Sequence, residues 1–172
     1  KDKAIKIAEE IINNFGEIYK KNWLEMMKKK LGLIGEKDND ENLINDLLSI
    51  MYENKTDYTN TFCLLMNENL QKDSMFNNKK FIDWHQKWKK RLEENNNSLE
   101  ESLKLMCSAN PLVIPRNHKV EEVLEAASKN DLNPFHDFLK VLEKPYENQT
   151  KTNNYQSSTA PSEKKYQTFC GT

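Results

Sequence analysis

The feature that most constrains the fold is the stretch from Ala4 to Leu31, where apolar residues recur at spacings of three and four. An α-helix turns once in about 3.6 residues, so this spacing gathers the apolar side chains on one face. They are Ala8, Ile11, Ile12, Phe15, Tyr19, Trp23, Met26 and Met27. The stretch therefore predicts one long amphipathic helix, and Gly32 is the residue type that commonly ends one.

Shorter stripes of the same spacing follow, up to Leu142. Their starts are predicted by residues that cap helices, and these are Asp40, Asp57, Ser98 with Glu101 as a capping box, Asn117, and Asn133 followed by Pro134. A further stripe contains Phe81, His85, Trp88 and Leu92. Between the stripes, Asn110-Pro111 and Pro115 bracket a segment expected to be extended, because proline disfavours helix at the residue before it. We thus expect about seven helices.

Glycine is scarce, with four residues among 172, which argues against phosphate-binding loops and against sheets with tight turns. The predicted fold class is all-α, an irregular multi-helix domain over residues 1–145. Residues 146–172 lose the helical periodicity and become rich in Asn, Thr, Ser, Gln and Lys. We expect this segment to be an extended carboxyl-terminal arm.

The formal net charge of −1 gives no electrostatic reason to expect nucleic acid or a membrane surface as partner. No apolar run approaches the length of a spanning helix, and no signal-peptide pattern is present. Three cysteines without Cys-x-x-Cys spacing favour a reducing compartment, so we expect a cytoplasmic, bacterial-type protein. Because Lys1 starts almost directly on the first helical pattern, we also expect an excised segment that lacks its native amino-terminal neighbour.

Few residues suggest chemistry. The histidines His85, His118 and His136 fall on separate elements without the i, i+4 pairing of metal ligands, so no metal site is expected. Adjacent acidic pairs point about 100° apart on a helix, which favours a solvated face over a catalytic couple. For the three tryptophans and the neighbouring methionines, packing in a core or a domain interface is favoured over a ligand groove.

Two places remain candidate sites. Arg116 is one of two arginines, and its planar guanidinium suits a carboxylate clamp between helices or a phosphate contact, the structural role being preferred. Its neighbours Asn117 and His118 are interface or capping candidates beside it. Cys170 lies three residues from the end of the sequence, where an accessible thiol could be redox-active, although no neighbouring residue lowers its pKa.

Five sequence blocks, in order and in register, resemble the carboxyl-terminal region of the selenoprotein O or YdiU family. They are KLGL at 30–33, DYTNTF at 57–62, NPLVIPRNHKVEEVLEAA at 110–127, the Pro-Tyr pair at 145–146 and YQTFCGT at 166–172. The resemblance implies a protein-kinase-like fold for the full-length protein. It also implies an activity, the transfer of AMP from ATP to protein hydroxyl groups with Mg²⁺ or Mn²⁺.

In that family the catalytic lysine, the acidic base and the metal ligands lie upstream of the matched region. The sequence has no Gly-rich loop, kinase-type catalytic loop or Asp-Phe-Gly, so we expect no catalytic residue and no bound cofactor in this segment. The expected partners are the missing amino-terminal kinase-like region and the protein substrates of the full-length enzyme. The family's terminal cysteine or selenocysteine strengthens the redox reading of Cys170, but this tail has no Cys-x-x-Cys partner. Cys63 also stands where a basic residue is expected in relatives.

Three functions therefore remain open. The leading hypothesis is a helical scaffold that buttresses the large lobe of a kinase-like enzyme. The first alternative is an autonomous helical protein-interaction module that uses its exposed aromatic stripes. The second is a small thiol redox protein, which requires a perturbed pKa at Cys170.

Overall fold

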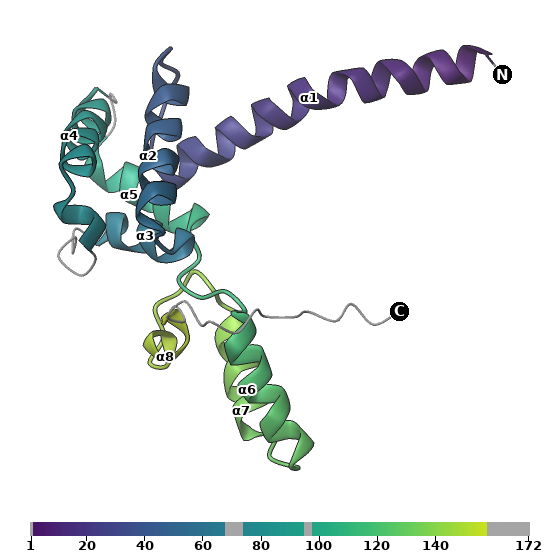
Figure 1. Cartoon of the computed structure of the whole chain (residues 1–172), viewed down its shortest axis with the longest axis vertical. Coiled ribbons are helices and arrows are strands. Elements are labelled where there is room, and N and C mark those ends of the chain that lie inside the picture. The colour runs from purple at the N-terminus through teal and green to yellow at the C-terminus, as the bar shows by residue number, and fades with distance from the viewer. Residues whose placement is uncertain (1, 68–73, 95–97, 158–172) are drawn as a thin grey trace. The chain divides into compact units, whose positions relative to one another are not determined.

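The computed structural model describes residues 2–67, 74–94 and 98–157. All regular elements in these ranges are helical, which confirms the all-α class (Figure 1). They are α1 Asp2–Lys30, α2 Asp40–Asn54, α3 Tyr58–Met66, the 3-10 helix η2 Ser74–Asn77, α4 Lys79–Glu93, α5 Leu99–Ala109, α6 Asn117–Ser128, α7 Asn133–Leu142 and α8 Thr152–Gln156. The short helices η2 and α8 were not predicted. The backbone forms two compact units, unit 1 from Lys1 to Pro111 and unit 2 from Leu112 to Thr172.

Helix α1 is the predicted long helix, and Gly32 ends it as expected. The Gly32 amide donates to the carbonyl of Lys29, and the Leu33 amide donates to that of Lys28, which is the Schellman pattern. Gly32 has a φ of 68°, and a Cβ placed there would lie 2.9 Å from the carbonyl oxygen of Ser102 in α5. Glycine is therefore needed both for the left-handed turn and for the close approach of α5.

Only the carboxyl-terminal end of α1 packs within unit 1. Side chains from Lys3 to Asn22 are exposed, whereas Met27 and Leu31 are fully buried. Figure 1 accordingly shows the first part of α1 extending away from α2–α5. Among the described residues, no helix combines the length and the apolar character needed to cross a membrane.

The core of unit 1 joins the end of α1 to α2, α3, α4 and α5. Its largest side chains belong to α4, where Trp84 and Trp88 stack with their ring centroids 5.8 Å apart. Each indole also reaches a backbone carbonyl of another segment. Trp84 donates to Leu43 at 2.8 Å, and Trp88 donates to Leu31 at 2.9 Å. The prediction that these tryptophans pack in a core is confirmed, and Trp23 is partly buried against the same cluster.

Three predicted helix starts in unit 1 have different outcomes. Asp57 accepts from the amide of Asn60, and Ser98 with Glu101 forms the complete capping box, so both predictions are confirmed. Asp40 does not cap α2. Asn39 holds the cap position without a side-chain hydrogen bond, and Asp40 is the first helical residue. Its carboxylate is instead bound by Arg91, as described below.

Unit 2 is built on the helices α6 and α7, which pack against each other. The turn between them has Asn130 in the left-handed conformation, with a φ of 65°. Arg116, not Asn117 as predicted, holds the cap position of α6, and Asn117 is its first helical residue. Helix α7 begins near the expected place, but Leu132 and not Asn133 holds its cap position, and Asn133 is its first helical residue. The Asp131 side chain accepts from the Asn133 amide.

The Pro-Tyr block is tied to the start of unit 2, since the Pro145 carbonyl accepts from the amides of Leu112 and Val113 at 2.7 and 3.3 Å. The predicted arm from residue 146 is described only as far as residue 157, and this part contains α8. Tyr155 of α8 stacks on Phe138 of α7 with the ring centroids 4.8 Å apart. The described part of the arm is therefore packed against α7.

Candidate functional site

Three of the sequence blocks that carry the family resemblance meet inside unit 1. Lys30 comes from KLGL at the end of α1, Tyr58 and Phe62 from DYTNTF in α3, and Asn110 from the segment after α5. The Lys30 ammonium lies 4.7 Å from the ring centroid of Phe62 and 5.4 Å from that of Tyr58. We call Lys30, Tyr58, Phe62, Cys63 and Asn110 the Lys30 junction.

Hydrogen bonds fix the junction to the backbone. The Lys30 ammonium donates to the Ala109 carbonyl at 3.3 Å. The Asn110 side-chain amide donates to the carbonyls of Lys30 and Met106, each at 2.9 Å, and thereby links the end of α1 to the end of α5. Both carbonyls belong to the last turn of a helix, and the Met106 carbonyl also accepts from the Asn110 backbone amide at 2.9 Å. The Asn110 side chain therefore binds the ends of α1 and α5 to each other.

Burial governs the electrostatics of the junction. Lys30 is 8% exposed. Desolvation lowers its pKa from the usual 10.5, although the negative charge of an ionised Cys63 acts in the opposite direction. Burial likewise raises the pKa of Tyr58, whose hydroxyl faces the sulfur of Met27 at 3.4 Å. The Lys30 ammonium is thus held between two aromatic rings and a backbone carbonyl, contacts that partly replace its lost hydration.

A second buried charge, absent from the sequence-based candidates, lies between α2 and α4. Arg91 Nε donates to Asp40 Oδ1 at 2.6 Å and Nη2 donates to Oδ2 at 3.0 Å, a bidentate pair, while the Lys28 ammonium is 3.8 Å from the same carboxylate. Arg91 also donates to the Ile34 carbonyl. A signal was present in the sequence, because Arg91 follows Trp84 and Trp88 at helical spacing on the buried face of α4.

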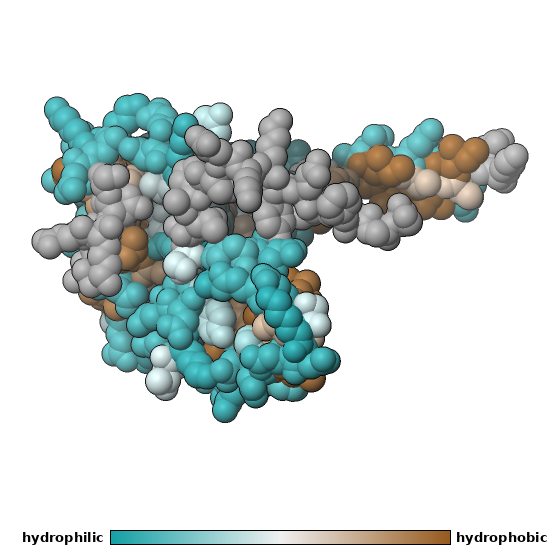
Figure 2. Space-filling view, turned by 60° about the horizontal axis from the view of Figure 1, so that its bottom comes forward, coloured by the Kyte–Doolittle hydropathy of each residue, from teal (hydrophilic) through white to brown (hydrophobic). Residues whose placement is uncertain are grey.

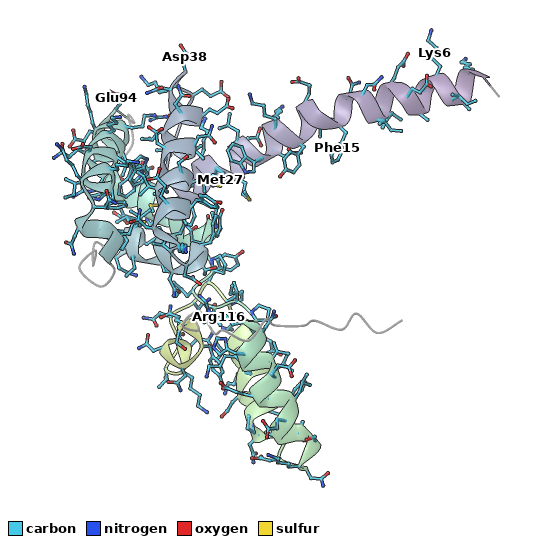
Figure 3. The ribbon with its side chains drawn as sticks, viewed as in Figure 1. Lys6, Phe15, Met27, Asp38, Glu94 and Arg116 are labelled. Carbon is cyan, nitrogen blue, oxygen red and sulfur yellow. The ribbon has the colours of Figure 1, made fainter. Side chains whose placement is uncertain are left out.

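The predicted candidates Arg116, Asn117 and His118 lie together at the start of α6 in unit 2 (Figure 3). Arg116 and His118 are half-buried, and Asn117 is exposed. Their proposed interface role stays a prediction. His85 lies against the rings of Phe81 and Trp88, with centroid distances of 5.6 and 5.4 Å. Cys170 lies outside the described residues, so its redox role also stays a prediction.

Within residues 2–67, 74–94 and 98–157, no three His, Cys, Asp or Glu side chains come together in a way that could hold a metal ion. An open hollow does occur beside the Lys30 junction, and it is lined by Leu48, Met51, Tyr52, Glu53, Lys55, Thr56 and Tyr58. Its lining includes two tyrosine rings, one glutamate and one lysine.

Comparison with known proteins places this helical assembly in a class. A family model described as "Protein adenylyltransferase SelO" matches residues 4–143, which include the Lys30 junction and the start of α6. The chain therefore belongs to this family, and the resemblance noted from the sequence blocks is confirmed.

Individual relatives agree with the assignment. The chain is 46% identical to the protein nucleotidyltransferase YdiU of Pelagibacter ubique (strain HTCC1062), over 99% of this chain and 35% of that protein. It is 45% identical to the YdiU protein of Clostridium botulinum (strain 657 / Type Ba4), with 99% of this chain and 35% of that protein covered. The chain thus spans about a third of the length of these curated relatives.

Proposed function

We propose that this chain is the helical carboxyl-terminal scaffold of a protein adenylyltransferase. The full-length protein would transfer AMP from ATP to protein hydroxyl groups in a kinase-like fold, and the cytoplasm expected from the cysteine usage would be its location. ATP and Mg²⁺ or Mn²⁺ would bind to polypeptide outside this chain. The chain itself would hold the catalytic region in position.

The Lys30 junction is the observation that carries the proposal. Three of the blocks that carry the resemblance converge there, where the Lys30 ammonium donates to the Ala109 carbonyl and lies against the Phe62 ring, and the Asn110 amide donates to the Lys30 carbonyl. The Lys30 side chain contacts Phe62 and Tyr58 of α3 and the carbonyl that ends α5, so it joins α1, α3 and α5 as a scaffold residue would. The family membership and the covered share of its relatives, 35%, are consistent with a supporting part of a larger enzyme.

Calorimetry tests the proposal directly. ATP with Mg²⁺ is titrated into this chain and into the full-length protein, and AMP transfer to protein is measured for both. We expect binding and transfer by the full-length protein and neither by the chain alone. Tight ATP binding by the chain alone would refute the division of roles.

The second candidate is an autonomous helical protein-interaction module, favoured by the exposed apolar side chains of α1. The scaffold and the interaction-module hypotheses differ in whether α1 needs upstream polypeptide in order to bind its partner. A module would bind its partners through α1 without upstream polypeptide. A full-length gene product with a long upstream segment that binds ATP would exclude this candidate.

A further inference from the structure

The first half of α1 carries a wide apolar stripe that no part of unit 1 covers. With about 100° of turn per residue, nine residues between Ala4 and Tyr19 fill an arc of roughly 160°, and no polar residue of that stretch falls inside it. These residues, the α1 stripe, are Ala4, Ile5, Ile7, Ala8, Ile11, Ile12, Phe15, Ile18 and Tyr19. All are exposed, including Ile12 at 70% and Phe15 at 66%. Figure 2 shows patches of hydrophobic surface along the visible face of the extending helix.

The stripe does not continue the face that α1 buries within unit 1. Trp23, Met27 and Leu31 define that buried face at the other end of the helix. Counted around the helix axis at about 100° per residue, its centre is turned by about 120° from the centre of the α1 stripe. In Figure 3, Phe15 of the stripe and Lys6 of the polar face point to opposite sides of α1. The stripe therefore needs a partner other than α2–α5.

The width of the stripe indicates the kind of partner. A two-stranded coiled coil buries a narrow seam of two positions in seven, whereas a helix in a globular core buries a broader face. An arc of roughly 160° exceeds what one partner helix covers. The partner that covers the α1 stripe should accordingly be a surface built from several helices or strands. A second copy of α1 is a single helix and is too narrow.

We propose that the α1 stripe is the surface on which the upstream part of the same polypeptide packs, so that α1 becomes a core helix of the complete enzyme. About two thirds of each curated relative lies outside the matched region, since the chain covers 35% of them. The family match begins at residue 4 and so includes the stripe. The inference rests on the proposed function only in its premise that the chain acts as part of a longer protein.

Cysteine accessibility tests the proposal. Phe15→Cys lies in the stripe, and Glu17→Cys lies on the polar face of the same turn as the matched control. Maleimide labelling of each site is followed by peptide mass spectrometry in this chain and in the full-length protein. We expect both sites to react at similar rates in the chain, and Phe15→Cys to react at least about tenfold more slowly in the full-length protein, since labelling then requires local opening.

Equal labelling of the two sites in the full-length protein would overturn the proposal. So would protection of Phe15→Cys that disappears on dilution, because a second copy would then be the occupant. A pair of stability variants gives an independent readout. Ile12→Glu should lower the unfolding temperature of the full-length protein, while the adjacent control Asn13→Glu should not. Equal effects of the two would contradict the proposal.

AMP transfer separates this inference from the proposed function. Protection of Phe15→Cys in a full-length protein that transfers no AMP would refute the activity and leave the docking surface standing. Transfer by a full-length protein that labels equally at both sites would refute the docking surface alone.

Discussion

At the scale of single residues, Gly32 both ends α1 with a left-handed turn and allows α5 to approach closely. Its positive φ is one that other residues reach only with strain, and the space beside it is already filled by the Ser102 carbonyl of α5. Gly35 has a similar φ of 74°, but nothing lies within 4 Å of its would-be Cβ. A side chain at Gly35 would therefore meet only backbone strain, whereas one at Gly32 would meet backbone strain and a steric clash.

We expect Gly32→Ala to destabilise the chain more than Gly35→Ala, by about 1–3 kcal/mol in the free energy of unfolding. Both variants bear the left-handed strain, and only Gly32→Ala must also push α5 away from α1. Urea unfolding followed by tryptophan fluorescence measures the difference. Equal losses would mean that α5 shifts without cost.

Lys30 makes stability depend on pH in a defined direction. Burial lowers its pKa in the folded state, so the unfolded chain holds more protons at high pH than the folded chain does. The free energy of unfolding should therefore rise as pH increases through the folded pKa towards the ordinary value of 10.5. Burial raises the pKa of Tyr58, which acts oppositely above pH 10.0, so the test uses a Tyr58→Phe background.

In that background, the stability of the parent relative to Lys30→Met should increase between neutral pH and pH 10.5. The difference between the two proteins cancels the titration of the exposed lysines. Urea unfolding at several pH values gives the comparison. A difference that stays constant with pH would contradict the buried, desolvated state of this ammonium.

The Asp40–Arg91 pair is an ion pair buried between α2 and α4. Asp40→Asn leaves the buried Arg91 guanidinium without its carboxylate, which should cost about 3–5 kcal/mol. Arg91→Met should cost less, because the Lys28 ammonium remains 3.8 Å from Asp40. The double variant should cost less than the sum of the two. The exposed pair Lys104–Glu100, at 2.7 Å, is the control. Glu100→Gln should change stability by less than about 0.5 kcal/mol. Additive losses at Asp40 and Arg91 would show that the pair is not coupled.

At the scale of elements, sequence reasoning succeeded where the determining contacts are local. The capping box of Ser98 and Glu101 and the Asp57 cap involve residues three positions apart, so a short stretch of sequence contains all the partners. Asp40 was wrongly predicted as a cap because its partner, Arg91, lies 51 residues away. The burial of Lys30 could not be predicted either, because a lysine at the end of a helix is usually exposed.

The spacing of apolar residues also predicted helix α1, but it did not show which of its faces other parts of unit 1 would bury. The described side chains in the first half of α1 are exposed, so this part of the helix should be energetically separate from the core of unit 1. Gly16→Pro removes a backbone donor and ends or kinks the helix there. In this chain we expect weaker helical circular dichroism and an unchanged midpoint of tryptophan fluorescence. Met27→Ala, in the buried end, should instead lower stability by about 2–5 kcal/mol.

At the scale of the whole molecule, the two units have cores of different size. In unit 1 the buried cluster includes residues from α1–α5, whereas the buried apolar residues described for unit 2 are Val113, Val123, Phe138 and Val141. A small core leaves little free energy after the entropy of folding is offset. Unit 2 should consequently unfold at a lower urea concentration than unit 1.

The tryptophans allow the two units to be followed separately, because Trp23, Trp84 and Trp88 are the three of the sequence and all belong to unit 1. Circular dichroism reports both units. Phe138→Ala should shift only the early part of the circular dichroism curve, since it removes about 3–5 kcal/mol from a core that the fluorescence does not monitor. Phe62→Ala, the matched control in unit 1, should shift the fluorescence midpoint. If Phe138→Ala moved that midpoint equally, the two units would unfold as one cooperative structure.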